Sequence, residues 1–348
     1  MTAPLLPSRL PIAAAPMAGG PTTTALAAAV AEAGGFAFLA AGYKTPEALS
    51  AEISVMRAAG LPFGVNLFVP APGTVDAAAF RAYARQLQPE AERYGLTLSE
   101  QPVVDDDYWE EKLALLTQDP VDVVSLTFGL PVPSDIAALQ AVGTTVLASV
   151  TTPEEAHQAQ AAGVDGLVVQ GPQAGGHSAT FDPARRIEPV STEDLVRSVS
   201  AETGLPLIAA GGVDGPAVVR ALLAAGAQAV AVGTLLLGTN EAGTSPTHRA
   251  ALTDDAFTET VLTRAFTGRP ARALRNGFID RHEPRALNAY PAVHHLTRAL
   301  RQAAGKAGDA GTVHLWAGTG WRGAPSGPAA GVVGWLAGEQ PRPGQSTQ

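Results

Sequence analysis

The residues best suited to chemistry gather in the stretch 167–180, which reads LVVQGPQAGGHSAT. Its opening apolar, β-branched run is typical of a buried parallel strand, and a Gly-Pro pair ends that run. Gly175 and Gly176 then allow positive φ and let backbone N–H groups approach an anion such as a phosphate. His177 follows directly and could donate to an anionic substrate or exchange a proton near neutral pH. A lone loop histidine is equally compatible with a solvated surface position, so its catalytic role depends on the rest of the chain.

Two later apolar runs end in small residues that suit a phosphate group. Gly211-Gly212 end one run, Gly233-Thr234 end the next, and a single βα unit separates them. At the last two strands of a βα barrel, such loops commonly form a phosphate site. Either pair alone could simply serve a β-to-α turn, but together they favour a phosphate-bearing cofactor.

Three further strand ends carry side chains that suit the ring system of a flavin. Met17 lies in APMAGG, Asn66 in GVNLF, and Gln170 at the end of the run before the histidine loop. An isoalloxazine needs an apolar slot for one edge and a few donors and acceptors for the other. Asn66 and Gln170 could supply these, or they could be buried amides that satisfy backbone groups.

These positions require elements that bring several strand ends together. Short apolar runs alternate with alanine-rich helical segments, and helix starts such as Thr45-Pro46 and Thr152-Pro153 carry a cap residue followed by proline. Eight such runs predict a (β/α)8 TIM barrel, in the α/β class, with its site at the C-terminal strand ends. A doubly wound sheet is the alternative, weakened because no GxGxxG follows the first run. The runs are 12–17, 35–42, 62–69, 122–129, 144–150, 166–171, 206–213 and 229–237.

The alternation of strands and helices is interrupted twice, between the third and fourth apolar runs and after the eighth. These two interruptions predict additions to the barrel. We expect barrel elements over 1–238, a smaller helical and loop-rich lid over 239–300, a closing segment over 301–337 and a disordered tail over 338–348. Between the third and fourth runs we expect a polar helix near 75–94. The acidic run Asp105-Asp106-Asp107 is interpreted as a solvated helix cap before a helix over 108–116, and we predict no metal site.

Composition excludes several classes of function. The chain has 348 residues with 46% hydrophobic content and a net charge of −9, and Lys and Arg do not cluster, which disfavours nucleic acid or an anionic membrane as partner. Cysteine is absent, so disulfides, thiolate metal sites and cysteine nucleophiles are excluded. No apolar run approaches the roughly 20 residues that span a bilayer, and no signal peptide is recognisable. We expect a cytoplasmic protein with a small-molecule partner, and we leave open a homodimer.

Six motifs in this order and spacing resemble those of the nitronate monooxygenase family, formerly called 2-nitropropane dioxygenases. They are APMAGG, PFGVNLF, VVSLTFGLP, GLVVQGPQAGGHSATF, LPLIAAGGV and AVAVGT, and the likeness covers roughly residues 11–279. The family is a TIM barrel that binds FMN and oxidises alkyl nitronates with O2 to carbonyl compounds and nitrite. The resemblance therefore implies FMN as cofactor, with an alkyl nitronate and O2 as reactants.

The resemblance also implies roles for individual residues. His177 would be the catalytic histidine, and the FMN contacts would come from Met17, Asn66, Gln170, Gly175, Gly176, Gly211, Gly212, Gly233 and Thr234. Thr127 stands where many relatives would carry histidine in an SFHFG-like loop, which puts the substrate in doubt. An NAD(P)H-dependent FMN reductase of quinones or enoyl thioesters is the alternative function, and a barrel that only stores or senses flavin is another.

Basic residues bear on that alternative, because a nicotinamide cofactor brings phosphates that need donors. Lys44 is the only basic residue in the strand-end loops, which disfavours a nicotinamide cofactor. The arginine-rich segment 264–285 is the one stretch that could supply such donors, by folding over the mouth of the barrel. His294, His295, Tyr290 and Lys44 could lie near the pocket, but helix-surface positions are the favoured interpretation. Trp316, in HLWAGTG, could cover an edge of the flavin or equally belong to the core.

Overall fold

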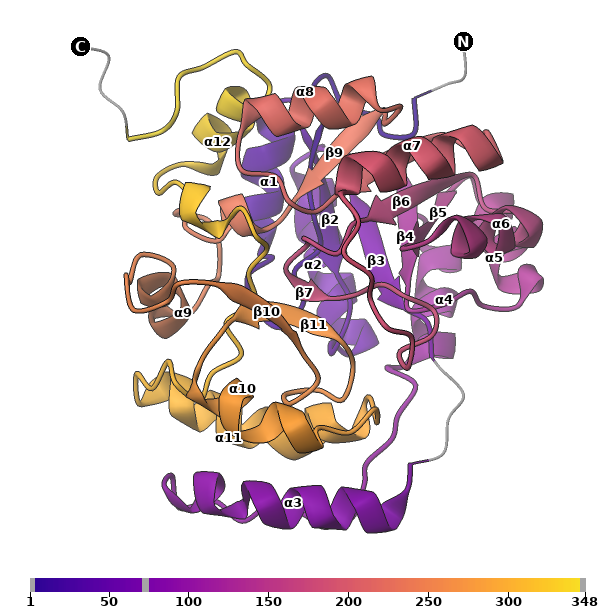
Figure 1. The fold of residues 1–348 in the computed structure, drawn as a ribbon. Helices are drawn as coiled ribbons and strands as arrows, with labels where there is room; N and C mark the ends of the chain where they lie inside the picture. Colours follow the sequence, from indigo (N-terminus) through magenta and orange to yellow (C-terminus); the bar gives the residue numbers. More distant parts are fainter. Residues whose placement is uncertain (1–3, 71–74, 345–348) are drawn as a thin grey trace.

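Eight parallel strands close into a barrel in a computed structural model that describes residues 4–70 and 75–344 (Figure 1). The barrel closes where β1 pairs with β9, with Ile12 opposite Val230. Each of the eight apolar runs contains one of these strands, which confirms the predicted (β/α)8 architecture. The strands are β1 (Ile12–Ala14), β2 (Phe36–Ala40), β3 (Gly64–Phe68), β4 (Val123–Thr127), β5 (Thr145–Val150), β6 (Gly166–Gln170), β8 (Leu207–Ala210) and β9 (Ala229–Val232).

Helices cover the outside of the barrel, and most begin with an identifiable signal. Thr45 and Thr152 accept hydrogen bonds as N-caps in front of a proline, as predicted, and Thr23 caps the first helix without a following proline. The last helix packs against the first and so completes the ring. The ring comprises α1 (Thr24–Glu32), α2 (Pro46–Ala58), α4 (Trp109–Gln118), α5 (Pro133–Ala141), α6 (Pro153–Ala162), α7 (Thr192–Thr203), α8 (Pro216–Ala224) and α12 (Ala329–Leu336).

Side chains fill the barrel interior at its N-terminal end. Phe36, Phe38 and Ile208 belong to the interior cluster, and Leu5 and Leu6 join it from the start of the chain. Leu5 donates its backbone N–H to the side chain of Gln228, just before β9. This end of the barrel is therefore plugged, which leaves the C-terminal strand ends for a ligand.

A second unit lies over the C-terminal strand ends. It contains a three-stranded antiparallel sheet in the order β10-β11-β7, with helices on its far side (Figure 1). Most of it comes from the chain between β9 and α12. Its elements are β7 (Gly176–His177), η1 (Thr234–Leu236), α9 (Pro246–Ala251), β10 (Thr260–Thr263), β11 (Ala271–Leu274), α10 (Gly277–His282), η2 (Glu283–Arg285), α11 (Ala292–Lys306) and η3 (Trp321–Gly323).

The helix α3 (Ala77–Glu92) joins this unit from the insertion between β3 and α4. It is the polar helix expected near 75–94, and it lies beneath α10 and α11, away from the barrel (Figure 1). Phe80 and Leu87 of α3 pack with Phe266, Phe278 and Val293 in one buried cluster. α3 thus packs with the lid, and α11 runs across residue 300. The predicted domain bounds stay a prediction.

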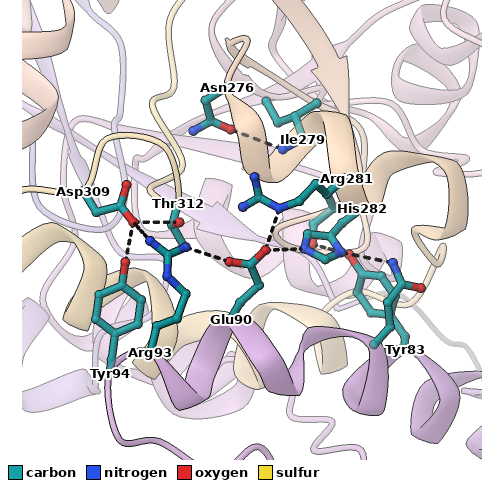
Figure 2. A network of polar contacts seen from close by, with 12 residues as sticks. Tyr83, Glu90, Arg93, Tyr94, Asn276, Ile279, Arg281, His282, Asp309 and Thr312 are labelled. Carbon is teal, nitrogen blue, oxygen red and sulfur yellow. Dashed lines mark hydrogen bonds and ion pairs between the residues drawn. The ribbon is translucent and has the colours of Figure 1, made fainter.

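A polar network fastens α3 to α10 (Figure 2). Glu90 accepts from Arg281 at 2.6 Å and lies 3.1 Å from His282, while Arg93 reaches both Glu90 and Asp309. Burial raises the pKa of Glu90, but hydrogen bonds from Arg281 and His282 outweigh it and hold that pKa below its usual value. Glu90 is therefore ionised at neutral pH and acts as an anionic clasp between two helices.

The acidic run before α4 differs from the expectation. The N-cap of α4 is Tyr108, which makes no side-chain cap bond. Asp107 instead lies 2.8 Å from the buried Lys112 and accepts from the backbone N–H of Tyr43. The solvated-cap interpretation is wrong for Asp107, because a buried ammonium group attracts the carboxylate more strongly than an exposed helix end does.

Two terminal features complete the fold. Of the tail predicted to be disordered, residues 345–348 lie outside the described part of the chain. Before them, Glu339 accepts from Arg9 at 2.7 Å and Arg342 lies over the ring of Trp335.

Within 4–70 and 75–344, no helix is both long enough and apolar enough to cross a membrane.

Candidate functional site

A cavity of about 1130 Å³ lies between the C-terminal strand ends and the lid. It receives residues from the barrel strands, from the loop that carries β7, and from α9 and α11. All ten residues predicted for the site line it: Met17, Asn66, Gln170, Gly175, Gly176, His177, Gly211, Gly212, Gly233 and Thr234. The sequence thus located the cavity, because the ends of parallel barrel strands meet at one rim.

His177 is held on both sides by backbone and side-chain bonds. It forms β7, which pairs with β11 with Ala271 opposite His177. The amide of Gln170 donates to the carbonyl of His177 at 3.2 Å and accepts from Ala179 N–H at 2.8 Å. The imidazole Nε2 lies 2.8 Å from the hydroxyl of Thr267. Gln170 lines the cavity, but its amide is already used to fix the histidine loop.

The surroundings of His177 keep its imidazole neutral. Burial, which has the largest effect, and the nearby cations Arg269 and Arg301 together lower its pKa to about 3. No carboxylate forms an ion pair with His177 in the described part of the chain. A neutral imidazole can accept a proton, and an anion bound beside it would raise its pKa.

Aromatic rings enclose His177. Phe128, Tyr290 and Trp316 surround it with ring centroids 5.6, 5.7 and 5.5 Å away. The ring of Phe128 also carries the guanidinium of Arg269, 4.0 Å from its centroid. Such a wall keeps water from the sides of the imidazole that it covers, which strengthens electrostatic interactions there.

A row of polar side chains crosses the barrel mouth beside this wall. Asn66, which is buried, donates to Ser125 and to Thr127, both at 2.9 Å. Thr127 in turn lies 3.2 Å from the hydroxyl of Ser149. Thr127, where a histidine was expected in relatives, therefore extends a hydroxyl and amide chain and brings no titratable group.

Glycine shapes two loops of the cavity wall: Gly212 has a φ of +76°, and Gly176, next to His177, has a φ of +74°. Both values lie in the region that favours glycine. A Cβ on Gly175 would come within 2.5 Å of Gly318 N, so the histidine loop packs backbone to backbone on the segment after Trp316. Within the described residues, the N–H groups of Gly212 and Gly233 have no protein acceptor. They remain free to bind an anion.

The charge on the cavity wall has one sign. Its lining includes Lys44, Arg298, Arg301 and Lys306 and no aspartate or glutamate among the described residues. The ammonium of Lys44 is paired with Glu52. In a chain with a net charge of −9, this wall selects for anionic ligands.

The source of these cations corrects the sequence analysis. The segment 264–285 does not line the cavity with arginine: Arg269 donates to carbonyls of the histidine loop, and Arg272 to the carbonyl of Pro172. The cations come from α11, whose Arg298, Gln302 and Lys306 recur every four residues on the face that lines the cavity. That helical spacing was readable in the sequence and was missed.

Several other residues differ from their predicted places. His294 is buried and stacks face to face on Tyr43 at 4.0 Å, and Tyr290 contacts His177, so the helix-surface interpretation is wrong for both. Trp316 lines the cavity. Thr267 and Phe128 were missed, because nothing in their local sequence distinguishes them from core residues.

Comparisons with known proteins agree with this geometry. A family model described as nitronate monooxygenase matches residues 5–337. A nitronate monooxygenase of Paraburkholderia phytofirmans is 38% identical, with 96% of this chain and 93% of the relative covered. A nitronate monooxygenase of Pseudomonas aeruginosa is 39% identical, with 94% of this chain and 95% of the relative covered.

Two solved structures share the architecture. A nitroalkane oxidase from Streptomyces ansochromogenes superposes with a TM-score of 0.90 at 48% identity, covering 96% of both chains. FabK from Thermotoga maritima superposes with a TM-score of 0.74 at 26% identity, covering 96% of this chain and 94% of that one.

Proposed function

Because the chain belongs to the nitronate monooxygenase family of oxidoreductases, we propose that it binds FMN in the cavity and oxidises alkyl nitronates with O2 to carbonyl compounds and nitrite. The observation that carries this proposal is the position of His177. It lies neutral inside a water-excluding aromatic wall, at the rim of a cavity whose charge favours anions. A protein that only stored flavin would not need a histidine held in that way.

The residues of the cavity fit FMN. The N–H groups of Gly212 and Gly233, which have no acceptor among the described residues, would form with the hydroxyl of Thr234 an anion cradle suited to a single phosphate. Met17, Val168 and Ile208 offer an apolar surface for a ring system. The volume of about 1130 Å³ exceeds the usual range of roughly 300–1,000 Å³ for ligand pockets, which leaves room for a substrate beside the cofactor.

The chain's own residues would bind and orient the substrate. Arg298 and Arg301 attract the nitronate, and the aromatic wall excludes water around it. His177 faces the negative oxygens, and its pKa rises as the anion binds, so anion binding and protonation of His177 are coupled. When bound, FMN supplies the electron acceptor that links nitronate oxidation to O2.

His177 can also prepare the substrate from a neutral nitroalkane. Its neutral imidazole removes the α-proton, and the electron pair of the broken C–H bond moves into the nitro group, which gives the nitronate. The low pKa of free His177 keeps it unprotonated for this step at neutral pH.

The proposal is tested with purified protein and a primary alkyl nitronate. We expect an oxidised-flavin spectrum, release of FMN on denaturation, and production of nitrite with uptake of O2. A His177→Asn variant should keep its flavin and lose turnover by roughly 10²–10⁴-fold, the range that a positioned acid or base supplies. A colourless protein that also fails to bind added FMN would refute the proposal, and normal turnover of the variant would refute the role of His177.

The alternative, an NAD(P)H-dependent FMN reductase, is favoured by one observation. Arg298 and Lys306 of α11 line the cavity and form no ion pair within the described residues, so they could bind phosphates of a nicotinamide cofactor. The sequence argument against this alternative assumed that such residues were absent. Nitronate oxidation remains the better proposal for two reasons. An anionic substrate would use the same cations, and the histidine held by Thr267 and the aromatic rings suits such a substrate.

A further inference from the structure

The hydrogen bond between His177 and Thr267 leaves open which atom donates. His177 Nε2 lies 2.8 Å from Thr267 Oγ1, and a neutral imidazole carries its proton on either nitrogen. The two tautomers present different groups to the substrate, either a lone pair or an N–H. Which nitrogen is protonated is set by the partner of the other nitrogen.

The surroundings of Thr267 decide the direction of this bond. The side chain is buried, with 1% of its surface exposed, and its hydroxyl donates to the carbonyl of Arg269 at 3.3 Å. Within the described residues, that hydroxyl is the only donor to this buried carbonyl. A buried carbonyl without a donor is costly, and a hydroxyl has one proton to give. Thr267 therefore accepts from His177.

The backbone around Thr267 keeps it in place. Ser178 N–H donates to the carbonyl of Pro270 at 2.8 Å, and the guanidinium of Arg269 donates to the carbonyl of Thr180. The segment 267–270 is thus bonded to both sides of the histidine loop. Rotation of the Thr267 hydroxyl toward His177 would leave the Arg269 carbonyl unpaired without any compensating bond.

We propose that Thr267 is a positioning residue that fixes His177 as the Nε2–H tautomer and so directs the unprotonated Nδ1 at the substrate. Nδ1 has no hydrogen-bond partner among the described residues and is not sealed from the cavity. In the deprotonation of a nitroalkane, the α-proton goes to Nδ1 and the C–H electron pair goes into the nitro group. Nε2 keeps its own proton throughout and donates it in the hydrogen bond to Thr267.

This inference rests on the proposed function for its catalytic meaning, but the tautomer itself can be measured without turnover. The holoprotein labelled with ¹⁵N-histidine is studied by NMR at neutral pH, with the His177 signals identified by their loss in His177→Asn. We expect a protonated Nε2 and an unprotonated Nδ1. A protonated Nδ1 in the wild-type protein would overturn the proposal whatever the enzyme's substrate.

A matched pair of variants tests the role of the hydroxyl. Thr267→Val removes the hydroxyl with little change in volume, and Thr267→Ser retains it. We expect Thr267→Val to lose roughly 10–100-fold in kcat with unchanged flavin content, and to show both tautomers of His177 by NMR, whereas Thr267→Ser keeps wild-type values. A Thr267→Val protein with a wild-type tautomer and wild-type kcat would contradict the proposal. If neither protein turns over nitronates, the NMR result still decides on the tautomer, and the proposed function alone fails.

Discussion

His177 combines two properties that depend on different neighbours. Burial and the cations Arg269 and Arg301 make the imidazole a weak proton acceptor, whereas Thr267 and the Gln170 amide fix its position. A weak, well-placed acceptor gains basicity when negative charge lies beside it, whether an anion binds or the nitro group becomes negative as the α-proton leaves. A preference for negative charge is thereby built into the protonation of one side chain.

The pH dependence of deprotonation follows from this arrangement. With a neutral nitroalkane as substrate, kcat/KM should show no loss assigned to His177 between pH 8 and pH 5, because the pKa of the free imidazole is lowered to about 3. Steady-state rates across this range are the measurement. An acid limb near the ordinary histidine pKa of about 6.5 would contradict the low pKa.

At the scale of elements, Gly175 lets the histidine loop pack directly on the segment after Trp316. A side chain at this position would collide with the backbone of Ala317 and Gly318, so the histidine loop and the segment after Trp316 could not both keep their places. We expect Gly175→Val to be purified without flavin, as measured from the ratio of flavin to protein absorbance. Gly331→Ala in α12, whose Cβ would meet its nearest atom at 3.6 Å, is the control and should retain flavin. A flavin-loaded Gly175→Val protein would show that this loop contact is dispensable.

The clasp between α3 and α10 should contribute to lid stability (Figure 2). Glu90→Gln keeps the size of the side chain but removes the charge that Arg281 and His282 face. We expect a loss of about 1–3 kcal/mol in the free energy of unfolding. Because the folded-state pKa of Glu90 is lowered, this contribution is present above the unfolded value of about 4.3 and disappears as the pH falls through the folded value.

Urea unfolding of Glu90→Gln at pH 7 measures the loss, and Glu92→Gln on the same helix is the control. Glu92 accepts only one bond from Gln88 at 3.3 Å and should change little. Equal stability of Glu90→Gln and the wild type would mean that apolar packing alone docks α3.

The elements show why the barrel was predictable and the lid was not. Each barrel strand is a buried parallel strand, so its apolar run is continuous and marked by a following helix start such as Thr45-Pro46. In the lid, β7 consists of only Gly176 and His177 and pairs with β11, which lies far away in the sequence. Such pairing leaves no local pattern. The contacts of Thr267, Phe128 and α3 likewise depend on tertiary packing and could not be read from their own segments.

For the whole molecule, several enclosed histidines predict sensitivity to acid: His248, His282 and His294 are buried, and His177 and His314 line the cavity. The pKa of His282 is lowered chiefly by burial. Burial lowers the pKa of His177 to about 3 and that of His248 to about 4, and it also lowers those of His294 and His314. Above the unfolded value of about 6.5, these groups are neutral in both states and cost nothing. As the pH falls below that value, the unfolded chain binds protons that the folded chain excludes, so stability declines.

We expect each such histidine to lower the free energy of unfolding by about 1.4 kcal/mol per pH unit between pH 6 and pH 5. Urea unfolding at pH 7, 6 and 5 measures this slope. His248→Asn should make the slope shallower, because it removes one group that binds a proton only in the unfolded chain. A stability that is constant from pH 7 to pH 5 would contradict the neutral state of these side chains.

The most direct test of the central claim compares two electron donors for the same flavin. A primary alkyl nitronate mixed with the aerobic protein should give nitrite and O2 uptake. NADH or NADPH mixed with the anaerobic protein in a stopped-flow instrument should bleach the flavin negligibly. Rapid anaerobic bleaching by either nucleotide, with no nitrite from any nitronate, would contradict this account and show that the protein is a reductase.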